Sequence, residues 1–388
     1  MFIHSHSHSQ SQSQSPSALA AASKYSPLSP AHCFQDALLV TVPPNRQFRV
    51  YCNPPNPEPD HASSPIVFVF HHGAGYSGLS AACLAREVRE QGRAQYGFLS
   101  FDCRAHGASQ VKSPDQASPD LSLPTLASDM VDLLRTMYPH RPHAPAFVLV
   151  GHSMGGAVAT EACAGVQEHV GRVIGLVVLD VVEGSALSAL TSMMPLINAR
   201  PSSFGSPAEC IKYHVDSHTI RNLASARISV PSLIRNSSAS SAPSASHPAT
   251  EDASADPPDT IGSEERFEWI TDLRRSQPHW EGWYRGLSAK FLAQKTARLL
   301  VLAGTDRLDK ELMIGQMQGK YQLSVLANVG HCVHEDDPAA LADLLVGFAD
   351  RNDAASSDQI LARLGKKPLQ KIPPPVTTIN TTSAARPP

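Results

Sequence analysis

The chain has 388 residues, 42% of them hydrophobic, and its 32 Lys and Arg residues almost balance its 35 Asp and Glu residues, for a net charge of −3. It lacks the basic excess with which proteins hold nucleic acids or anionic membranes. No apolar run reaches the roughly 18 residues of a membrane span, and the first residues show no signal-peptide pattern. The seven cysteines are odd in number and lack C-x-x-C spacing, which favours a reducing compartment. We expect neither a nucleic-acid nor a membrane partner.

Three segments of low complexity divide the chain. Residues 1–34 are rich in His, Ser and Gln, residues 236–262 in Ser, Ala, Pro and Asp, and residues 353–388 in Pro and Thr. Such segments bury too little apolar surface to offset their ordering entropy, so we expect all three to be disordered. One domain at 35–352 remains.

Two features of the terminal segments have a possible functional interpretation, but in each case an interpretation without function is more typical. The alternating His4, His6 and His8 could bind a metal, but they are more typical of a disordered tail, and we expect no metal or cofactor. Lys366 and Lys367 are more typical of solvating charges than of a nuclear signal. The expected location is the cytoplasm, with the nucleus left open.

Strand and helix patterns alternate along the rest of the chain. Short apolar runs predict strands, and apolar residues at helical spacing predict helices between them. The strands are expected at 48–52, 66–70, 97–101, 146–150, 174–179, 298–302 and 323–327, and the helices at 80–91, 121–138, 155–164, 312–318 and 339–351. This order predicts a mainly parallel sheet wrapped by helices, with functional groups at the carboxyl ends of the strands.

The most specific motif is Gly-His-Ser-Met-Gly at 151–155, directly after one predicted strand and directly before a helix. A strand-to-helix turn this tight accepts only small side chains around Ser153. It lifts the serine hydroxyl clear of the sheet and points the Met154 N–H toward the same space. The motif in this context predicts an α/β-hydrolase fold with Ser153 as nucleophile.

Two further motifs supply the groups that such a serine needs. His-Gly-Ala-Gly at 72–75 follows the first buried strand, where the backbone N–H groups of Ala74 and Gly75 could face an oxyanion. Gly330-His331 follows the last predicted strand and offers an imidazole as general base. His334 is the local alternative, but His331 lies nearer the strand end, and we prefer it.

The acid that orients this histidine stays open on the residues alone. Asp180 ends one predicted strand and Asp306 follows the next, and both stand in the order serine, acid, histidine. The position of Asp306 is the usual one in this fold. Asp102 precedes the serine and is expected to hold its own loop by hydrogen bonds.

The excursion at about 184–297 is too long for a simple crossover, so we expect it to form a lid over the strand ends. It holds all three tryptophans, which are typical of a small core of its own. Arg200, Arg221 and Arg285 could meet an acidic partner there, although each is more typical of a solvated surface.

From residue 43 to residue 348 the sequence resembles the protein phosphatase methylesterase family. Beyond the common serine motif, the most particular runs are Asp-Val-Val-Glu-Gly at 180–184 and Gly-Gln-Met-Gln-Gly-Lys at 315–320. Others lie at 221–227, 283–288, 306–310 and 330–336. The family has Gly-Gly-Gly-His at the oxyanion loop, where this chain has Gly-Ala-Gly-Tyr at 73–76.

The resemblance implies an activity that motif spacing alone does not reveal. Family members remove the methyl ester from the C-terminal leucine of the catalytic subunit of protein phosphatase 2A, so the C-terminal tail of that subunit is the expected partner. The resemblance also implies that Asp180 is the acid and that no cofactor is needed. Two alternatives stand beside it: a small-molecule carboxylesterase or lipase of the same fold, and a non-catalytic module that docks on the phosphatase.

Overall fold

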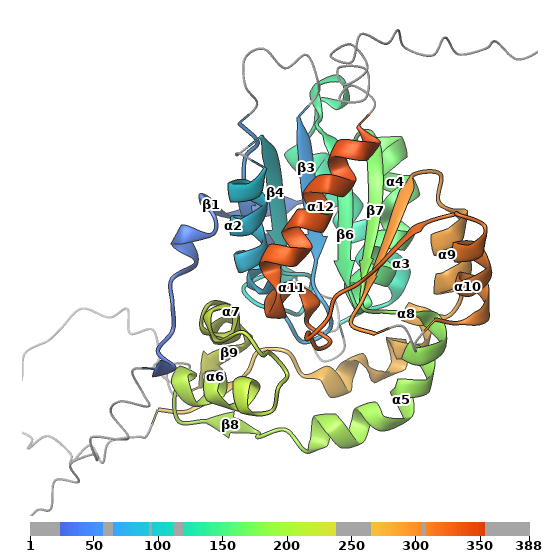
Figure 1. Cartoon of the computed structure of the whole chain (residues 1–388). Coiled ribbons are helices and arrows are strands. Elements are labelled where there is room, and N and C mark those ends of the chain that lie inside the picture. The colour runs from blue at the N-terminus through green and yellow to red at the C-terminus, as the bar shows by residue number, and fades with distance from the viewer. Residues whose placement is uncertain are drawn as a thin grey trace, which may run out of the picture.

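The computed structural model describes residues 24–56, 65–92, 95–111, 119–237, 265–304 and 308–353. This part of the chain folds around a nine-stranded sheet with the order β1-β2-β4-β3-β6-β7-β11-β12, and β5 pairs with β2 (Figure 1). The strands are β1 (Asp36–Val42), β2 (Arg46–Asn53), β3 (Ile66–His71), β4 (Tyr96–Phe101), β5 (Gln110–Val111), β6 (Ala146–His152), β7 (Val173–Leu179), β11 (Ala297–Leu302) and β12 (Gln322–Val325). From β4 to β12 neighbouring strands run parallel, whereas β2 is antiparallel to β1, β4 and β5.

Helices cover both faces of this sheet, which is why its central strands are buried at every position and mostly apolar. All residues of β3, β6 and β7 are buried. In β3, Phe68 and Phe70 face one core, and Val67 and Val69 face the other, as the two-residue period of a strand requires. The first core holds α2 (Ala82–Gln91) and α12 (Pro338–Asn352), and the second holds α3 (Leu123–Met137) and α4 (Met154–His169). The predicted mainly parallel sheet wrapped by helices is confirmed.

Between β7 and β11 the chain leaves the sheet and forms a separate layer, here called the lid segment (residues 183–294). Figure 1 shows most of it at the end of the sheet where β7 finishes and α5 begins. A three-stranded antiparallel sheet, β8-β10-β9, lies within it. Its elements are α5 (Glu183–Asn198), β8 (Ser203–Phe204), α6 (Pro207–Asp216), α7 (Leu223–Ser229), β9 (Ile234–Asn236), β10 (Phe267–Trp269), η6 (Leu273–His279), α8 (Trp280–Tyr284) and α9 (Leu287–Ala293).

Two short helices complete the domain beyond the lid segment. Helix α10 (Lys310–Met317) connects β11 to β12, and α11 (Val333–Asp336) follows β12 just after His331. Within the described residues, no helix is long and apolar enough to cross a membrane.

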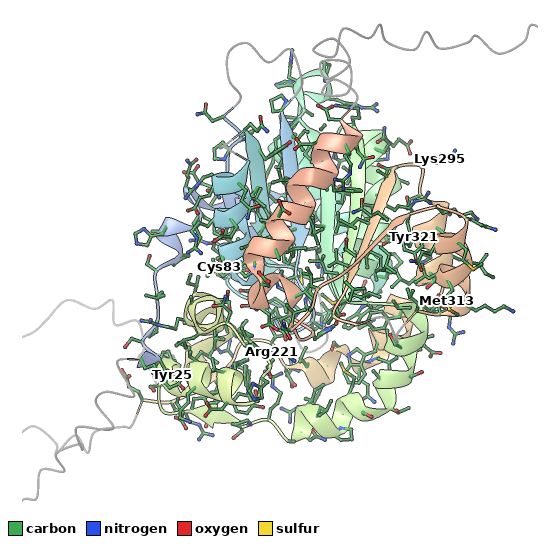
Figure 2. The ribbon with its side chains drawn as sticks, viewed as in Figure 1. Tyr25, Cys83, Arg221, Lys295, Met313 and Tyr321 are labelled. Carbon is green, nitrogen blue, oxygen red and sulfur yellow. The ribbon has the colours of Figure 1, made fainter. Side chains whose placement is uncertain are left out.

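The ordered domain is larger than the sequence predicted at both ends. Tyr25 is buried against the lid segment (Figure 2), and Cys33 and Phe34 are buried in the core beside α2. Asp353 is buried as well and pairs with Arg172 at 3.2 Å. The described structure thus extends beyond the expected boundaries at 34/35 and 352/353, because a few anchoring side chains stand among Ser and Pro. The rest of the expected tails and nearly all of the insertion at 236–262 lie outside the described residues, as do the His4–His8 and Lys366–Lys367 features.

Candidate active site

Ser153 occupies a strained turn between β6 and α4. Its φ of 53° and ψ of −119° are unusual for a residue with a side chain. A Cβ on Gly151 would lie 2.0 Å from the Gly155 carbonyl oxygen, and one on Gly155 would lie 2.1 Å from the His71 carbonyl oxygen. Only glycine fits at either position, so the local sequence enforces the tight turn that presents Ser153.

The structure brings Asp180 and His331 together. Nδ1 of His331 lies 2.8 Å from Oδ2 of Asp180, while Oδ1 of Asp180 accepts the Ala303 N–H at 2.9 Å. The Asp180 side chain is fully buried, whereas 45% of the His331 side chain is exposed. Because a carboxylate only accepts hydrogen bonds, Nδ1 carries the proton and Nε2 is left as the basic nitrogen.

His334 and Asp102, two other candidates for the base and the acid, take no part in this pair. His334 is buried against Phe70 and His152, and burial lowers its pKa to about 3. Neither of its ring nitrogens has a hydrogen-bond partner among the described residues. Asp102 is buried, and its carboxylate accepts the N–H groups of Gly78 and Ala108, as expected for a residue that holds its loop. Asp306 lies outside the described residues.

His152, the residue before the nucleophile, supports the histidine loop in a way that sequence analysis did not foresee. Nε2 of His152 lies 2.9 Å from the His331 carbonyl oxygen, and the two ring centres are 4.7 Å apart. Burial holds the pKa of His152 well below its usual value, so the ring is neutral and can donate from Nε2. The last residue of β6, directly before Ser153, thus fixes the backbone of His331.

A tyrosine of the lid segment lines the same pocket as the nucleophile. Tyr284 is buried, and burial raises the pKa of its phenol. No hydrogen bond joins Ser153 to His331 in the described structure. Loosely aligned or absent Ser–His contacts are common before substrate binds. The run at 283–288, which the sequence analysis singled out, was the one indication of Tyr284.

The structure corrects one of the three expected oxyanion donors. The Gly75 N–H donates to Nε2 of His106 at 2.9 Å, so it is not available to substrate. Burial lowers the pKa of His106 to about 4, which keeps this ring neutral and able to accept. The Ala74 N–H has no hydrogen-bond partner among the described residues, and Ala74 lines the same pocket as Ser153. The Met154 N–H belongs to the first turn of α4, where N–H groups lack intrahelical partners.

A pocket of about 640 Å³ opens over these residues, within the range of small-ligand sites. Ala74, Ser153, Asp180, Tyr284 and His331 line its reactive end. Helix α5 supplies a mostly apolar wall, formed by Ser185, Ala186, Ala189, Leu190, Met193 and Leu196. Leu196 is 65% exposed, so it forms an apolar rim. Sequence analysis did not predict this wall, because no motif marks it. Among the described residues, no cluster of His, Cys, Asp or Glu could hold a metal ion.

Comparison with known proteins agrees with this architecture. The model of the alpha/beta hydrolase family matches residues 67–344. The solved structure of E-2-(acetamidomethylene)succinate hydrolase superposes with a TM-score of 0.57 and 17% identity, covering 81% of this chain and 99% of that one. A thioesterase domain from the curacin biosynthetic pathway gives a TM-score of 0.53 and 18% identity over 80% of this chain and 99% of its own. The fold and the strained serine turn define an α/β hydrolase.

Relatives in sequence identify the particular family within the α/β hydrolases. A Cryptococcus neoformans protein named protein phosphatase methylesterase 1 is 43% identical over 347 residues, which cover 84% of this chain and 79% of the relative. The relative of that name in Emericella nidulans is 46% identical over 304 residues, 76% of this chain and 69% of its own. The chain belongs to the protein phosphatase methylesterase 1 family of α/β hydrolases, which confirms the resemblance.

Proposed function

We propose that this protein is a serine carboxylesterase that removes the methyl ester from the C-terminal leucine of the catalytic subunit of protein phosphatase 2A. The observation that carries the proposal is the pairing of Asp180 with His331 beside Ser153, within a chain 43% identical to a named methylesterase. The choice of phosphatase 2A and of its C-terminal tail comes from the sequence resemblance.

The proposed reaction begins with Ser153. Its Oγ attacks the ester carbonyl while Nε2 of His331 takes its proton, and Asp180 stabilises the imidazolium that forms. The developing oxyanion accepts hydrogen bonds from the N–H groups of Ala74 and Met154. His331 then returns the proton to the methoxy oxygen, and methanol leaves. A water molecule, activated by the same imidazole, releases the free carboxylate and restores Ser153.

Before attack, the Ser153 hydroxyl must form a hydrogen bond with His331. Rotation of the short serine side chain is enough, because the turn already fixes the backbone. Tyr284, the last residue of α8, lines the same pocket, so the lid segment forms part of the space in which Ser153 turns.

The apolar wall of the pocket suits a leucine side chain. Leu190, Met193 and Leu196 stand along α5, so the C-terminal leucine could bury its side chain there while its ester lies at Ser153. The same lining also favours the second candidate, an esterase for small apolar substrates. A non-catalytic module is disfavoured, since the structure keeps Asp180, His331 and the strained serine together.

Two hydrolysis assays separate these functions: methanol release from the methylated subunit and phenol release from small aryl esters. The purified protein is incubated with carboxymethylated phosphatase 2A catalytic subunit and, in parallel, with short-chain aryl esters. The proposal predicts a kcat/KM for the methylated subunit well above that for any aryl ester. Aryl-ester turnover with an untouched methylated subunit would support the small-molecule esterase instead, and no turnover of either would support the binding module.

A further inference from the structure

Of the three arginines that the sequence placed in the lid segment, two have a carboxylate partner. Arg285 pairs with Glu281 on the surface, and Nε of Arg221 lies 3.9 Å from Asp336. Arg200 has no such partner in the part of the chain that the structure describes. Its guanidinium instead lies 3.6 Å from the centre of the Trp269 ring.

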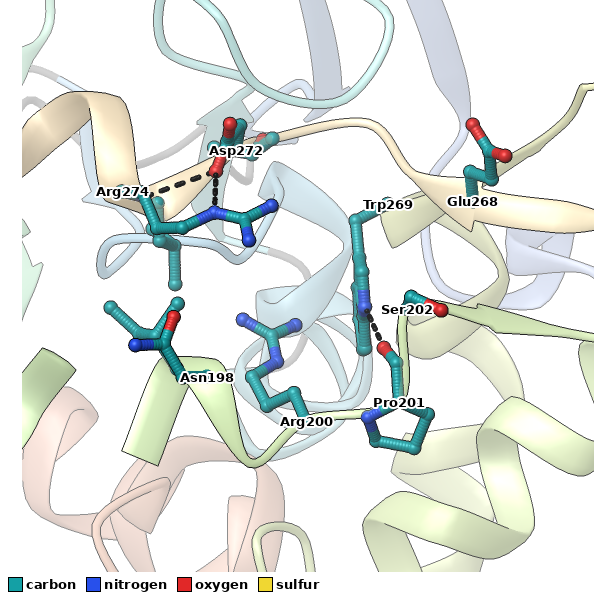
Figure 3. A pocket seen from close by; sticks show the side chains of 11 residues that line it. Asn198, Arg200, Pro201, Ser202, Glu268, Trp269, Asp272 and Arg274 are labelled. Carbon is teal, nitrogen blue, oxygen red and sulfur yellow. Dashed lines mark hydrogen bonds and ion pairs between the residues drawn. The ribbon is translucent and has the colours of Figure 1, made fainter. Parts of the chain in front are cut away.

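Arg200 and Trp269 line a pocket of about 320 Å³ in the lid segment. Figure 3 shows the guanidinium of Arg200 against the face of Trp269 and directed into this pocket. The indole N–H donates to the Pro201 carbonyl oxygen at 2.8 Å, which fixes the ring that supports the cation. Stacking uses only the face of the guanidinium, so the N–H groups at its edge stay available to a ligand.

The carboxylates in the wall of this pocket are engaged with other cations. Asp272 pairs with Arg274 at 3.0 Å and with Arg275 at 3.7 Å. Glu268 lies 3.5 Å from Arg266. Among the described residues, no carboxylate therefore neutralises the half-buried Arg200, and burial lowers its pKa. The fold has already removed part of the water around the planar guanidinium of Arg200. An entering carboxylate would therefore form hydrogen bonds with its N–H groups at a smaller desolvation cost.

The Arg200 pocket adjoins the pocket over Ser153. Leu196 lines the Ser153 pocket and Ile197, the next residue of α5, lines the Arg200 pocket. Leu273 lines the Arg200 pocket and packs on the oxyanion loop, because a Cβ on Gly75 would lie 2.9 Å from its Cδ1. The end of α5 thus lies between the two pockets and Leu273 connects the Arg200 pocket to the oxyanion loop, so a peptide with its end at Ser153 can place an upstream side chain at Arg200.

We propose that the Arg200 pocket is a subsite for the substrate peptide, which binds the carboxylate side chain of an Asp or Glu upstream of the methyl-esterified C-terminus. The inference rests on the proposed function and adds the chemistry of a second substrate residue. A carboxylate fits better than a phosphate, since Asp272 and Glu268 in the same wall repel a doubly charged group more strongly.

Peptide methyl esters test this subsite. Each peptide ends in leucine methyl ester and carries Asp, or Asn in its matched partner, at one of the five positions before the leucine. Methanol release gives kcat/KM for each pair with the full-length protein. At one position we expect Asp to be preferred over Asn by about tenfold, the value of one charge-assisted contact.

Two variants test whether Arg200 binds the carboxylate of the peptide's Asp side chain. Arg200→Gln should abolish the preference for Asp over Asn. Arg275→Gln, which removes a nearby exposed charge already paired with Asp272, should keep it. If Arg200→Gln does not fold, Arg200→Lys replaces it. A lysine lacks the planar fork, so the preference should fall several-fold.

The outcomes separate the subsite from the proposed function. No preference for Asp at any position, or an unchanged preference in Arg200→Gln or Arg200→Lys, overturns the subsite while hydrolysis of the Asn peptides still supports the methylesterase. An equal loss on the Asp and Asn peptides in Arg200→Gln makes Arg200 structural and overturns the subsite as well. Failure to hydrolyse any peptide ester or the methylated subunit overturns both proposals.

Discussion

Asp180 bridges the ends of two strands and the histidine loop: Oδ2 lies 2.8 Å from Nδ1 of His331, and Oδ1 accepts the Ala303 N–H at 2.9 Å. Its backbone has a positive φ of 48°, and its N–H donates to the Val301 carbonyl oxygen. These contacts hold the carboxylate between β7 and β11, where it fixes both the orientation and the tautomer of His331.

Asp180→Asn should therefore remove turnover and spare the fold. The amide keeps the shape of the side chain but favours the wrong tautomer of His331, a change that costs about 10⁴-fold in kcat in a serine protease. Asp306→Asn is the matched control at the usual position of the acid and should lower activity only mildly. Turnover and melting temperature are measured for both. A normal Asp180→Asn with an inactive Asp306→Asn would reverse the assignment.

Tyr284, which lines the same pocket as Ser153, gives a second prediction. Tyr284→Phe keeps the buried ring and removes only the hydroxyl, to which the proposed reaction assigns no proton transfer. The kcat/KM for a small aryl ester should therefore change by no more than about fivefold, the value of one neutral hydrogen bond. A fall of tenfold or more would show instead that the hydroxyl assists the reaction.

The glycines of the serine turn give a prediction about stability. Gly155→Ala places a Cβ 2.1 Å from the backbone oxygen of His71, which cannot move without disturbing β3. We expect the free energy of unfolding to drop by about 3 kcal/mol or more. Gly282→Ala is the control, because Gly282 lies in α8 with nothing within 4 Å of the added Cβ. It should change stability by less than about 1 kcal/mol, toward greater stability. Equal urea midpoints for the two variants would contradict the close approach.

Buried histidines make the fold sensitive to acid. Burial lowers the pKa of His334 to about 3, so the folded state resists a proton that the unfolded chain accepts near 6.5. The free energy of unfolding therefore falls as the pH drops below about 6.5, because only the unfolded chain gains the proton. At pH 5 the loss due to His334 is about 2 kcal/mol.

Comparison with a variant isolates this effect from groups that titrate in the opposite sense, such as Asp102, whose pKa burial raises to about 6. His334→Leu should lose about 2 kcal/mol less than the parent protein between pH 7 and pH 5, measured by urea unfolding at both values. Identical pH dependence in the two proteins would show that His334 is not held neutral.

Local sequence predicted the features that depend on local geometry. The apolar runs of β3, β6 and β7 and the glycines around Ser153 each specify their structure within a few residues, because a buried strand and a tight turn restrict side chains directly. Strand β1 escaped prediction, since Leu38 and Leu39 are largely exposed and the alternation that marks a half-buried strand is absent.

The features that sequence analysis missed depend on contacts between distant segments. The N–H of Gly75 was expected to face substrate, but it is taken by His106, 31 residues away. The contact of His152 with the His331 backbone joins residues 179 positions apart. Periodicity and spacing do not reveal such pairings. They do not reveal the apolar wall of α5 either, because its side chains line a pocket instead of packing into a core.

The most direct test of the account is the release of methanol from carboxymethylated phosphatase 2A catalytic subunit by the full-length protein and by Ser153→Ala. The account predicts loss of the methyl ester with an equal amount of methanol, and a drop in turnover on the order of 10⁶-fold in the folded variant, as for other serine nucleophiles. Demethylation by Ser153→Ala within tenfold of the parent protein, or a methylated subunit left intact by the active esterase, would contradict it.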